Sequence, residues 1–170
     1  MKNKNYILGI DPGLNNTGWG VVESINNKEI YISHGVIKTE SKNILGERLN
    51  FIYDNLSNLF KKFKPCHVAV EKIFSNKNPD STLKLGKARG IVFLVAAKKN
   101  VNISEYSPNT VKKNLVGYGH ASKLQIIEMI SRIYPGIDIG NNDDSADALA
   151  VATCHSMQSQ SKITKKLQQL

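Results

Sequence analysis

The sequence predicts an α/β fold in which helices flank a five-stranded mixed sheet. Three observations favour it. The chain opens with three apolar runs separated by turn residues, it then alternates helical periodicity with short strands, and its 170 residues suit one domain. With 41% hydrophobic and 22% charged residues, the chain can bury a core and does not have the composition of a disordered protein. An antiparallel meander followed by crossover units predicts parallel strands beside antiparallel ones.

The first part of the chain predicts the meander. Residues 6–10 form a short apolar run that ends at Asp11-Pro12-Gly13, a pattern typical of a buried strand closing in a turn. Residues 17–24 and 30–38 predict the second and third strands, and Asn26-Asn27 between them predicts a hairpin turn.

Helices and strands alternate after the meander. Leucine, isoleucine and phenylalanine recur at helical spacing and predict a helix that ends before Pro65. The valine-rich residues 67–71 predict a fourth strand. A second helix follows, capped by Asp80 or Ser81, and leads to a fifth strand over residues 101–106.

The C-terminal part is predicted to be helical. Ser107, followed by proline, and Ser122 both fit positions that cap a helix N-terminus. A last helix is expected to begin near Asp143 and to end near residue 157. We therefore predict a single domain over residues 1–157 and a basic, flexible tail over residues 158–170.

Charge and localisation signals narrow the class of function. The net charge of +9 favours a polyanionic partner, which is either nucleic acid or an anionic membrane surface. The two cysteines, Cys66 and Cys154, lie far apart and suggest no disulfide framework, as expected in a reducing compartment. Because no apolar run approaches the length of a membrane span or a signal core, we expect a cytoplasmic protein that does not enter the membrane.

Four acidic residues carry the predicted chemistry. Asp11 and Glu71 each follow a predicted strand, and Asp144 and Asp147 are three residues apart on one face of the last helix. Ligands of open α/β sheets bind beyond the carboxyl ends of the strands, so the four carboxylates can converge there. Such a cluster needs cations, and carboxylate oxygens suit Mg²⁺ or Mn²⁺.

Each acid also has an ordinary structural interpretation. Asp11 can serve only as a turn former, and Glu71 as a solvated strand end. Asp143 and Asp144 are acids of the kind favoured at a helix N-terminus. The basic and aromatic residues are less specific still, because scattered lysines are usually a solvated face. The predicted contacts to DNA phosphates and bases are Phe74, Lys84, Arg89, Lys112, Lys113, Tyr118 and Lys123.

These motifs, in combination, resemble the RuvC family of bacterial Holliday-junction resolvases, in the RNase H-like superfamily. The resemblance spans roughly residues 5–157. The matching stretches are 7–13, Thr17-Gly18, Val70-Glu71, Phe74, Asn78, Ser81, 83–86, 88–90, Glu105-Tyr106, Val111-Lys112, Val116-Gly117, Gly119, Lys123 and 144–150.

The resemblance implies a homodimeric nuclease that nicks four-way junction DNA symmetrically, during recombination and repair. It implies that Asp11, Glu71, Asp144 and Asp147 are both catalytic residues and ligands of two Mg²⁺ ions, with Mn²⁺ as an alternative, and that the cut ends carry 5′-phosphate and 3′-hydroxyl groups. It also implies a branch-migration motor as a partner. Lys72 departs from the family, in which an uncharged amide is expected after the glutamate.

Three other functions are compatible with parts of the pattern. An RNase H-like nuclease could instead cut an RNA–DNA hybrid. A nucleotide-binding fold of the actin or sugar-kinase kind also places an aspartate turn beside phosphates, but it needs a second phosphate loop, which we do not find. A junction-binding module without activity would be expected to lack one of the four acids.

Overall fold

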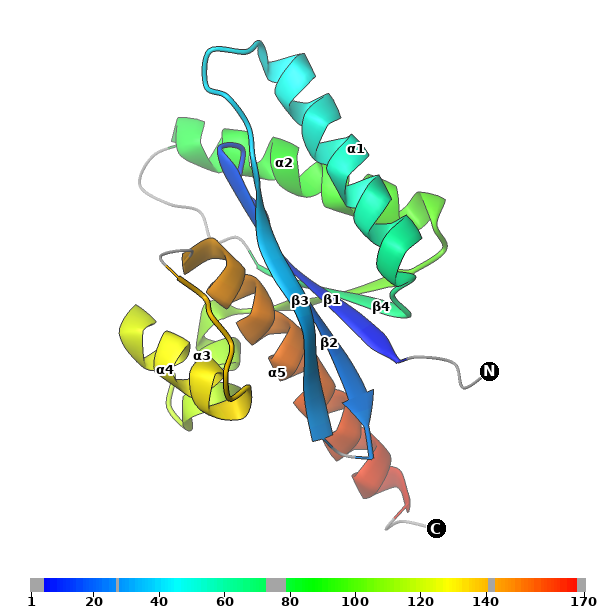
Figure 1. Cartoon of the computed structure of the whole chain (residues 1–170), viewed down its shortest axis with the longest axis vertical. Helices are drawn as coiled ribbons and strands as arrows, with labels where there is room; N and C mark the ends of the chain where they lie inside the picture. Colours follow the sequence, from blue (N-terminus) through cyan, green and yellow to red (C-terminus); the bar gives the residue numbers. More distant parts are fainter. Residues whose placement is uncertain (1–4, 27, 73–78, 141–142, 168–170) are drawn as a thin grey trace.

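The computed structural model describes residues 5–26, 28–72, 79–140 and 143–167, without the side chains of Pro79, Ser81 and 162–167. The described residues form five strands and five helices (Figure 1). In chain order these are β1 (Tyr6–Asp11), β2 (Asn16–Ile25), β3 (Lys28–Lys38), α1 (Leu45–Phe63), β4 (His67–Glu71), α2 (Pro79–Lys98), β5 (Asn102–Tyr106), α3 (Pro108–Val116), α4 (Lys123–Ile133) and α5 (Asp143–Leu167).

The strands form one mixed sheet in the order β3-β2-β1-β4-β5. The pairs β3–β2 and β2–β1 are antiparallel, whereas β1–β4 and β4–β5 are parallel. The predicted fold class, a meander joined to parallel strands, is therefore confirmed. The hairpin between β2 and β3 turns at Asn26, whose φ of 49° lies in the left-handed region that asparagine tolerates.

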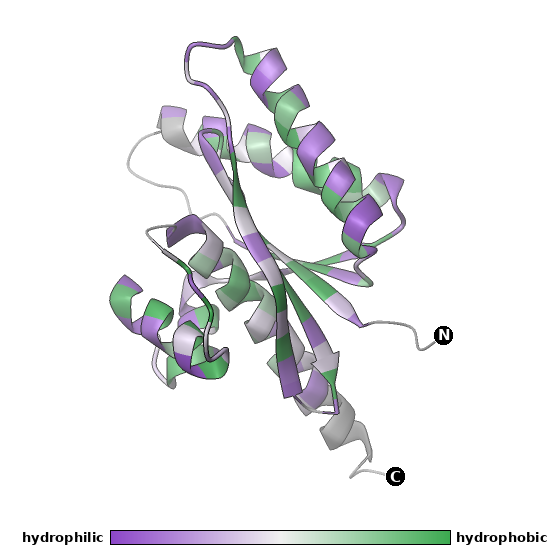
Figure 2. Ribbon diagram, in the orientation of Figure 1, coloured by the Kyte–Doolittle hydropathy of each residue, from purple (hydrophilic) through white to green (hydrophobic). Residues whose placement is uncertain are grey.

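Helices cover both faces of the sheet (Figure 1). Alternate strand residues point to opposite faces, so Leu8 and Ile10 of β1 pack on the side of α1 and α2, and Ile7 packs on the side of α3, α4 and α5. Apolar and polar residues alternate along α1 (Figure 2), which buries Ile52 and Leu56 against the sheet. Each side of the sheet thus has its own core.

Glycines let α5 lie directly on β1 and β2. A Cβ atom on Gly9 would lie 2.0 Å from the carbonyl oxygen of Ala148, and one on Gly18 would lie 1.9 Å from that of Asp144. Backbone atoms cannot move aside as a flexible side chain can, so only glycine fits at these two positions. The first turns of α5 are therefore held against the part of the sheet where β1 ends and β2 begins.

Two predicted helix boundaries are wrong. Helix α2 begins at Pro79, so Asp80 and Ser81 lie inside its first turn and do not precede it as caps. Helix α5 does not end near residue 157 but continues to Leu167. Its extension carries Gln160, whose amide donates hydrogen bonds to Ser24 and Glu29 at 3.0 and 3.1 Å, and these contacts attach the added turns to the β2–β3 hairpin.

The two predicted serine caps are confirmed. The Ser107 hydroxyl accepts a hydrogen bond from the backbone N–H of Thr110, and Ser122 forms a reciprocal capping box with Gln125. Across the part of the chain that the structure describes, none of the helices has the length and apolar character that a membrane crossing requires.

Candidate active site at the carboxyl end of the sheet

The two strand-end acids lie on neighbouring parallel strands, as their sequence positions predict. Ile10 of β1 pairs with Val70 of β4, so Asp11 and Glu71 follow at the same level. Their side chains alternate with those of Ile10 and Val70, which are buried on the α1 and α2 side. Asp11 and Glu71 therefore point to the opposite side, where α5 packs.

Helix α5 brings the other two acids to the same edge. Gly18 pairs with Asp11 in the sheet and is in close contact with the backbone of Asp144. Asp147 follows one turn later on α5. In the turn that follows Asp11, the Thr17 hydroxyl donates a 2.7 Å hydrogen bond to the carbonyl of Gly13 and stabilises that turn.

The pKa values show that the acids interact electrostatically. Burial, and then the negative charges of Asp147, Glu71 and Asp144, raise the pKa of Asp11 to about 8. Burial and the charge of Asp147 raise the pKa of Glu71 to about 6, against the opposing effect of Lys112 and Lys123. Burial is also the first cause of a raised pKa at Asp147. The site therefore carries more negative charge than its lysines offset.

Lys123, at the first position of α4, is a cation in contact with this cluster. Its ammonium lies 3.3 Å from a carboxylate oxygen of Asp147 and 3.4 Å from one of Asp143. Burial lowers the pKa of Lys123, but the charges of Asp147 and Asp143 outweigh it and raise that pKa overall. Asp143, four residues before Asp147 and thus on the same face of α5, is a site residue that the sequence analysis did not single out.

An open pocket adjoins the acids between β4, α3, α4 and α5. Its polar lining consists of Glu71 and Asp147 from the acidic cluster and Lys112 and Lys123 from α3 and α4. Among the described residues, no three histidine, cysteine, aspartate or glutamate side chains are already gathered closely enough to hold a metal ion. The acids thus share an edge of the sheet without forming a closed metal cage.

The predicted DNA-contact residues separate into groups. Lys112 and Lys123 line the pocket, and Lys113 and Tyr118 are exposed nearby in sequence, on α3 and on the loop that follows it. Lys84 is exposed on α2, which covers the opposite face of the sheet. Phe74 lies outside the described residues.

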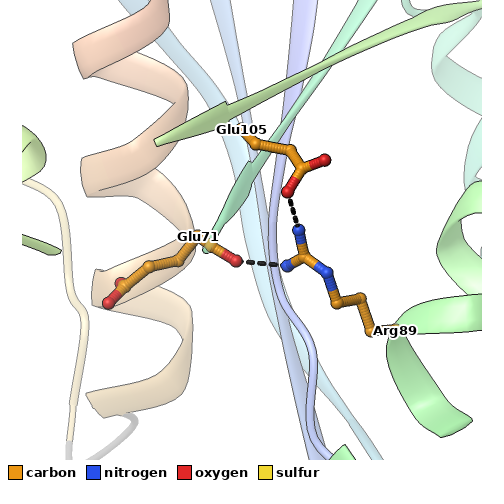
Figure 3. A network of polar contacts seen from close by, with 3 residues as sticks. All are labelled: Glu71, Arg89 and Glu105. Carbon is orange, nitrogen blue, oxygen red and sulfur yellow. Dashed lines mark hydrogen bonds and ion pairs between the residues drawn. The ribbon is translucent and has the colours of Figure 1, made fainter. Parts of the chain in front are cut away.

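Arg89 has protein partners at the ends of β4 and β5, and its predicted contact with DNA stays a prediction. Its side chain is 12% exposed and points to the sheet, where it hydrogen-bonds the backbone carbonyl of Glu71 and forms an ion pair with Glu105 (Figure 3). The sequence pattern did not reveal this role, because it does not distinguish an arginine that contacts the sheet from one on the solvent-exposed face of a helix.

Comparisons with known proteins agree with one another. The family model described as crossover junction endodeoxyribonuclease RuvC matches residues 7–155. A protein of that name from Rhizobium etli is 43% identical over 155 residues, which are 91% of this chain and 91% of the relative. A second, from Paramagnetospirillum magneticum, is 45% identical over 149 residues, 88% of this chain and 89% of the relative.

Solved structures give the same result. Thermus thermophilus RuvC in complex with a Holliday junction substrate superposes with a TM-score of 0.86 at 31% identity, covering 92% of this chain and 96% of that one. The yeast mitochondrial Holliday junction resolvase, at a TM-score of 0.65 and 17% identity over 95% of this chain and 83% of that one, shares the fold.

Proposed function

The chain belongs to the RuvC family of crossover junction endodeoxyribonucleases, and on this basis we propose that it resolves four-way DNA junctions by paired, metal-dependent nicks. The observation that carries the proposal is the arrangement of the acids. Asp11 and Glu71 end adjacent parallel strands, and α5 brings Asp144 and Asp147 to the same edge, beside a pocket with two lysines. Phosphodiester hydrolysis needs such a set of oxygen ligands next to cationic groups that hold the backbone.

The residues of the site fit a hard divalent cation. Family membership implies dependence on a divalent metal, and the donors are carboxylate oxygens, which Mg²⁺ and Mn²⁺ prefer. Burial, and then the negative charges of Asp147, Glu71 and Asp144, raise the pKa of Asp11 to about 8, and a bound cation would offset those charges. We propose two Mg²⁺ ions per subunit, held by the four acids. Asp147 also forms an ion pair with Lys123 at 3.3 Å, so its carboxylate would serve both the lysine and an ion.

The protein residues have separable tasks in the reaction. When bound, the metal supplies the activation of the attacking water and the stabilisation of the departing oxygen. Asp11, Glu71, Asp144 and Asp147 fix the geometry for in-line attack. Water adds to phosphorus as the bond to the 3′ oxygen breaks, which leaves a 5′-phosphate and a 3′-hydroxyl.

The lysines and aromatic residues complete the proposed DNA contacts. Lys112 and Lys123 hold the scissile phosphate at the pocket, and Lys113 and Lys84 add sequence-independent contacts to the backbone. Asp143 helps to keep Lys123 next to the pocket through an ion pair at 3.4 Å. Phe74 and Tyr118 are proposed to stack on bases exposed at the crossover.

The experiment that tests this chemistry uses a four-way junction in Mg²⁺, in Mn²⁺ and in EDTA, followed by resealing of the products with a DNA ligase. We expect cutting in both metals and none in EDTA. The nicks should ligate directly, since DNA ligase requires a 5′-phosphate next to a 3′-hydroxyl. Preferred cutting of an RNA–DNA hybrid would contradict junction resolution and indicate a nuclease that acts on hybrids. Binding without cutting in either metal would instead favour a junction-binding module.

Two-fold symmetry is the simplest way to make two matched nicks, so we propose that the chain acts as a homodimer in the bacterial cytoplasm, with a branch-migration motor as a further partner. Helix α2 offers the dimer surface. It buries residues such as Ala88 and Val92 against the sheet and exposes Leu83, Gly86 and Leu94 on another side. A Cβ atom on Gly86 or Gly90 would meet nothing within 4 Å, so a second helix can approach closely there.

Gly86→Glu should separate the dimer without unfolding the subunit. The added side chain enters open space in the subunit, but two glutamates would face each other in a two-fold contact and repel. We expect a monomer by analytical ultracentrifugation. On a plasmid with an extruded cruciform it should give nicked circles, whereas the wild type gives linear DNA. The matched control is Gly46→Glu on α1, another open glycine. If Gly86→Glu remains dimeric and makes linear DNA, the assigned surface is wrong.

A further inference from the structure

Arg89 occupies a site with three partners on the inner side of α2. Its guanidinium donates one hydrogen bond to the backbone carbonyl of Glu71 and another to the carboxylate of Glu105 on β5 (Figure 3). The ring of Phe93, one turn later on α2, lies 5.2 Å from the guanidinium carbon. A planar fork can serve two acceptors on adjacent strands at once, which an ammonium group on a single flexible stem does less well. Arg89 thus joins α2 to the ends of β4 and β5.

The peptide unit after Glu71 is held at both of its polar ends. Its carbonyl oxygen accepts from Arg89, and its N–H, which belongs to Lys72, donates a 2.7 Å hydrogen bond to the carbonyl of Tyr106 on β5. These two contacts fix the rotation of the backbone at Glu71, where β4 ends. The direction of the Glu71 side chain follows from that rotation.

The carboxylate of Glu71 has few direct contacts of its own among the described residues. It points away from Arg89 (Figure 3), into the pocket lined by Asp147, Lys112 and Lys123. Among the described residues, no hydrogen bond or ion pair to its oxygens is found, and Lys112 and Lys123 act on it only through longer-range charge. Its position therefore depends on the backbone that Arg89 holds.

We infer that Arg89 is a positioning residue for the proposed metal ligand Glu71, acting through the backbone at the end of β4 from the opposite face of the sheet. In this role Arg89 acts on the metal ligand through the protein and not as a ligand itself. Loss of the guanidinium leaves all four acidic residues present, but it allows the backbone and the carboxylate of Glu71 to rotate. A misplacement of about 1 Å at a reacting group can cost roughly 100-fold in rate. This inference rests on the proposed function, because it takes Glu71 to be a metal ligand.

The test compares Arg89→Ala with Arg132→Ala, which removes an arginine exposed on α4. We expect Arg89→Ala to lower the single-turnover nicking rate on saturating junction about 10- to 100-fold and to weaken Mn²⁺ binding by the DNA-free dimer about 10-fold. Its affinity for the junction should change less than twofold. Arg132→Ala should match the wild type in both nicking rate and Mn²⁺ binding.

Chemical rescue separates positioning from a general loss of structure. Methylguanidinium at a non-denaturing concentration should restore part of the nicking rate and the Mn²⁺ affinity of Arg89→Ala, whereas methylammonium at the same concentration should not. If Arg89→Ala fails to fold, Arg89→Lys replaces it, because an ammonium group serves the two acceptors less well than a guanidinium. It should also lose nicking rate and Mn²⁺ affinity, and wild-type values of both would overturn the inference.

Three further outcomes would overturn the inference. One is wild-type nicking and Mn²⁺ binding in Arg89→Ala. Another is a defect confined to junction affinity, which would restore the interpretation of Arg89 as a phosphate contact. The third is a loss that methylguanidinium and methylammonium restore equally. A wild-type protein that binds Mn²⁺ but cuts no junction would contradict the proposed function alone, since the effect of Arg89→Ala on Mn²⁺ binding would still be measurable.

Discussion

Asp11→Asn is expected to abolish junction nicking while junction binding survives. Asparagine keeps the size of the side chain but is a far weaker ligand for a hard cation than a carboxylate. We expect a loss of at least roughly 1,000-fold in rate, equivalent to about 4 kcal/mol in the barrier. The lysines are unchanged, so the dissociation constant for the junction should stay within about twofold. Single-turnover nicking and a bandshift titration measure the two effects.

The same variant should stabilise the metal-free protein, in a way that depends on pH. The pKa of Asp11 is raised to about 8 in the folded chain, above its value of about 3.9 when unfolded. The folded state therefore binds the proton more tightly, and stability is lost as pH rises from about 4 through 8. Asparagine has no charge to bury. The gain in unfolding free energy should be near zero at pH 4 and several kcal/mol at pH 8.5, with an upper bound of about 5 kcal/mol for a rise of about four pKa units.

Urea unfolding in EDTA at both pH values tests this linkage. The control is Asp54→Asn on α1, an exposed carboxylate outside the site, which should show no comparable dependence on pH. Wild-type nicking by Asp11→Asn would remove Asp11 from the metal site. Equal unfolding free energies of Asp11→Asn and the wild type at pH 8.5 would show that burial of the Asp11 charge does not destabilise the protein.

Gly18→Ala is expected to impair both stability and nicking, because the new methyl group has no room. An ideal Cβ at this position lies 1.9 Å from the carbonyl oxygen of Asp144, so the start of α5 has to move away from β2. Overpacking of this kind typically costs about 1–3 kcal/mol in stability. Asp144 and Asp147 would move with the helix, away from Asp11. We expect nicking under conditions where the variant is fully folded to fall about 100-fold.

Gly46→Ala is the matched control, because its Cβ would meet nothing within 4 Å on α1. It should keep wild-type nicking and lose no stability, since alanine favours helix over glycine. Nicking by folded Gly18→Ala at the wild-type rate would show that the packing of α5 on β2 does not set the position of the acids.

The sequence predicted the sheet and the location of the acids well, for a physical reason. Strand alternation and turn residues placed Asp11 and Glu71 at strand ends, and the parallel pairing of β1 and β4 follows from the crossover connection through α1. The spacing of Asp144 and Asp147 then required only a helix. These signals are local, and local signals survive without knowledge of the tertiary structure.

Contacts between residues far apart in the chain could not be predicted from such local sequence signals. A periodic pattern says that Arg89 is on a helix but not that its guanidinium reaches the backbone of Glu71, 18 residues earlier. The end of α5 was missed because residues 158–167 are polar, and the contacts of Gln160 with Ser24 and Glu29 join segments more than 130 residues apart. Asp143 could have been found from its spacing of four to Asp147.

The most direct test of the central claim is to incubate the wild-type chain with an end-labelled mobile four-way junction in Mg²⁺ and to map the cuts on a denaturing gel. We expect paired nicks at symmetric positions on two strands of like polarity, with none in EDTA and none on a linear duplex of the same sequence. A junction bandshift without nicks, or equal cutting of the linear duplex, would contradict the central claim.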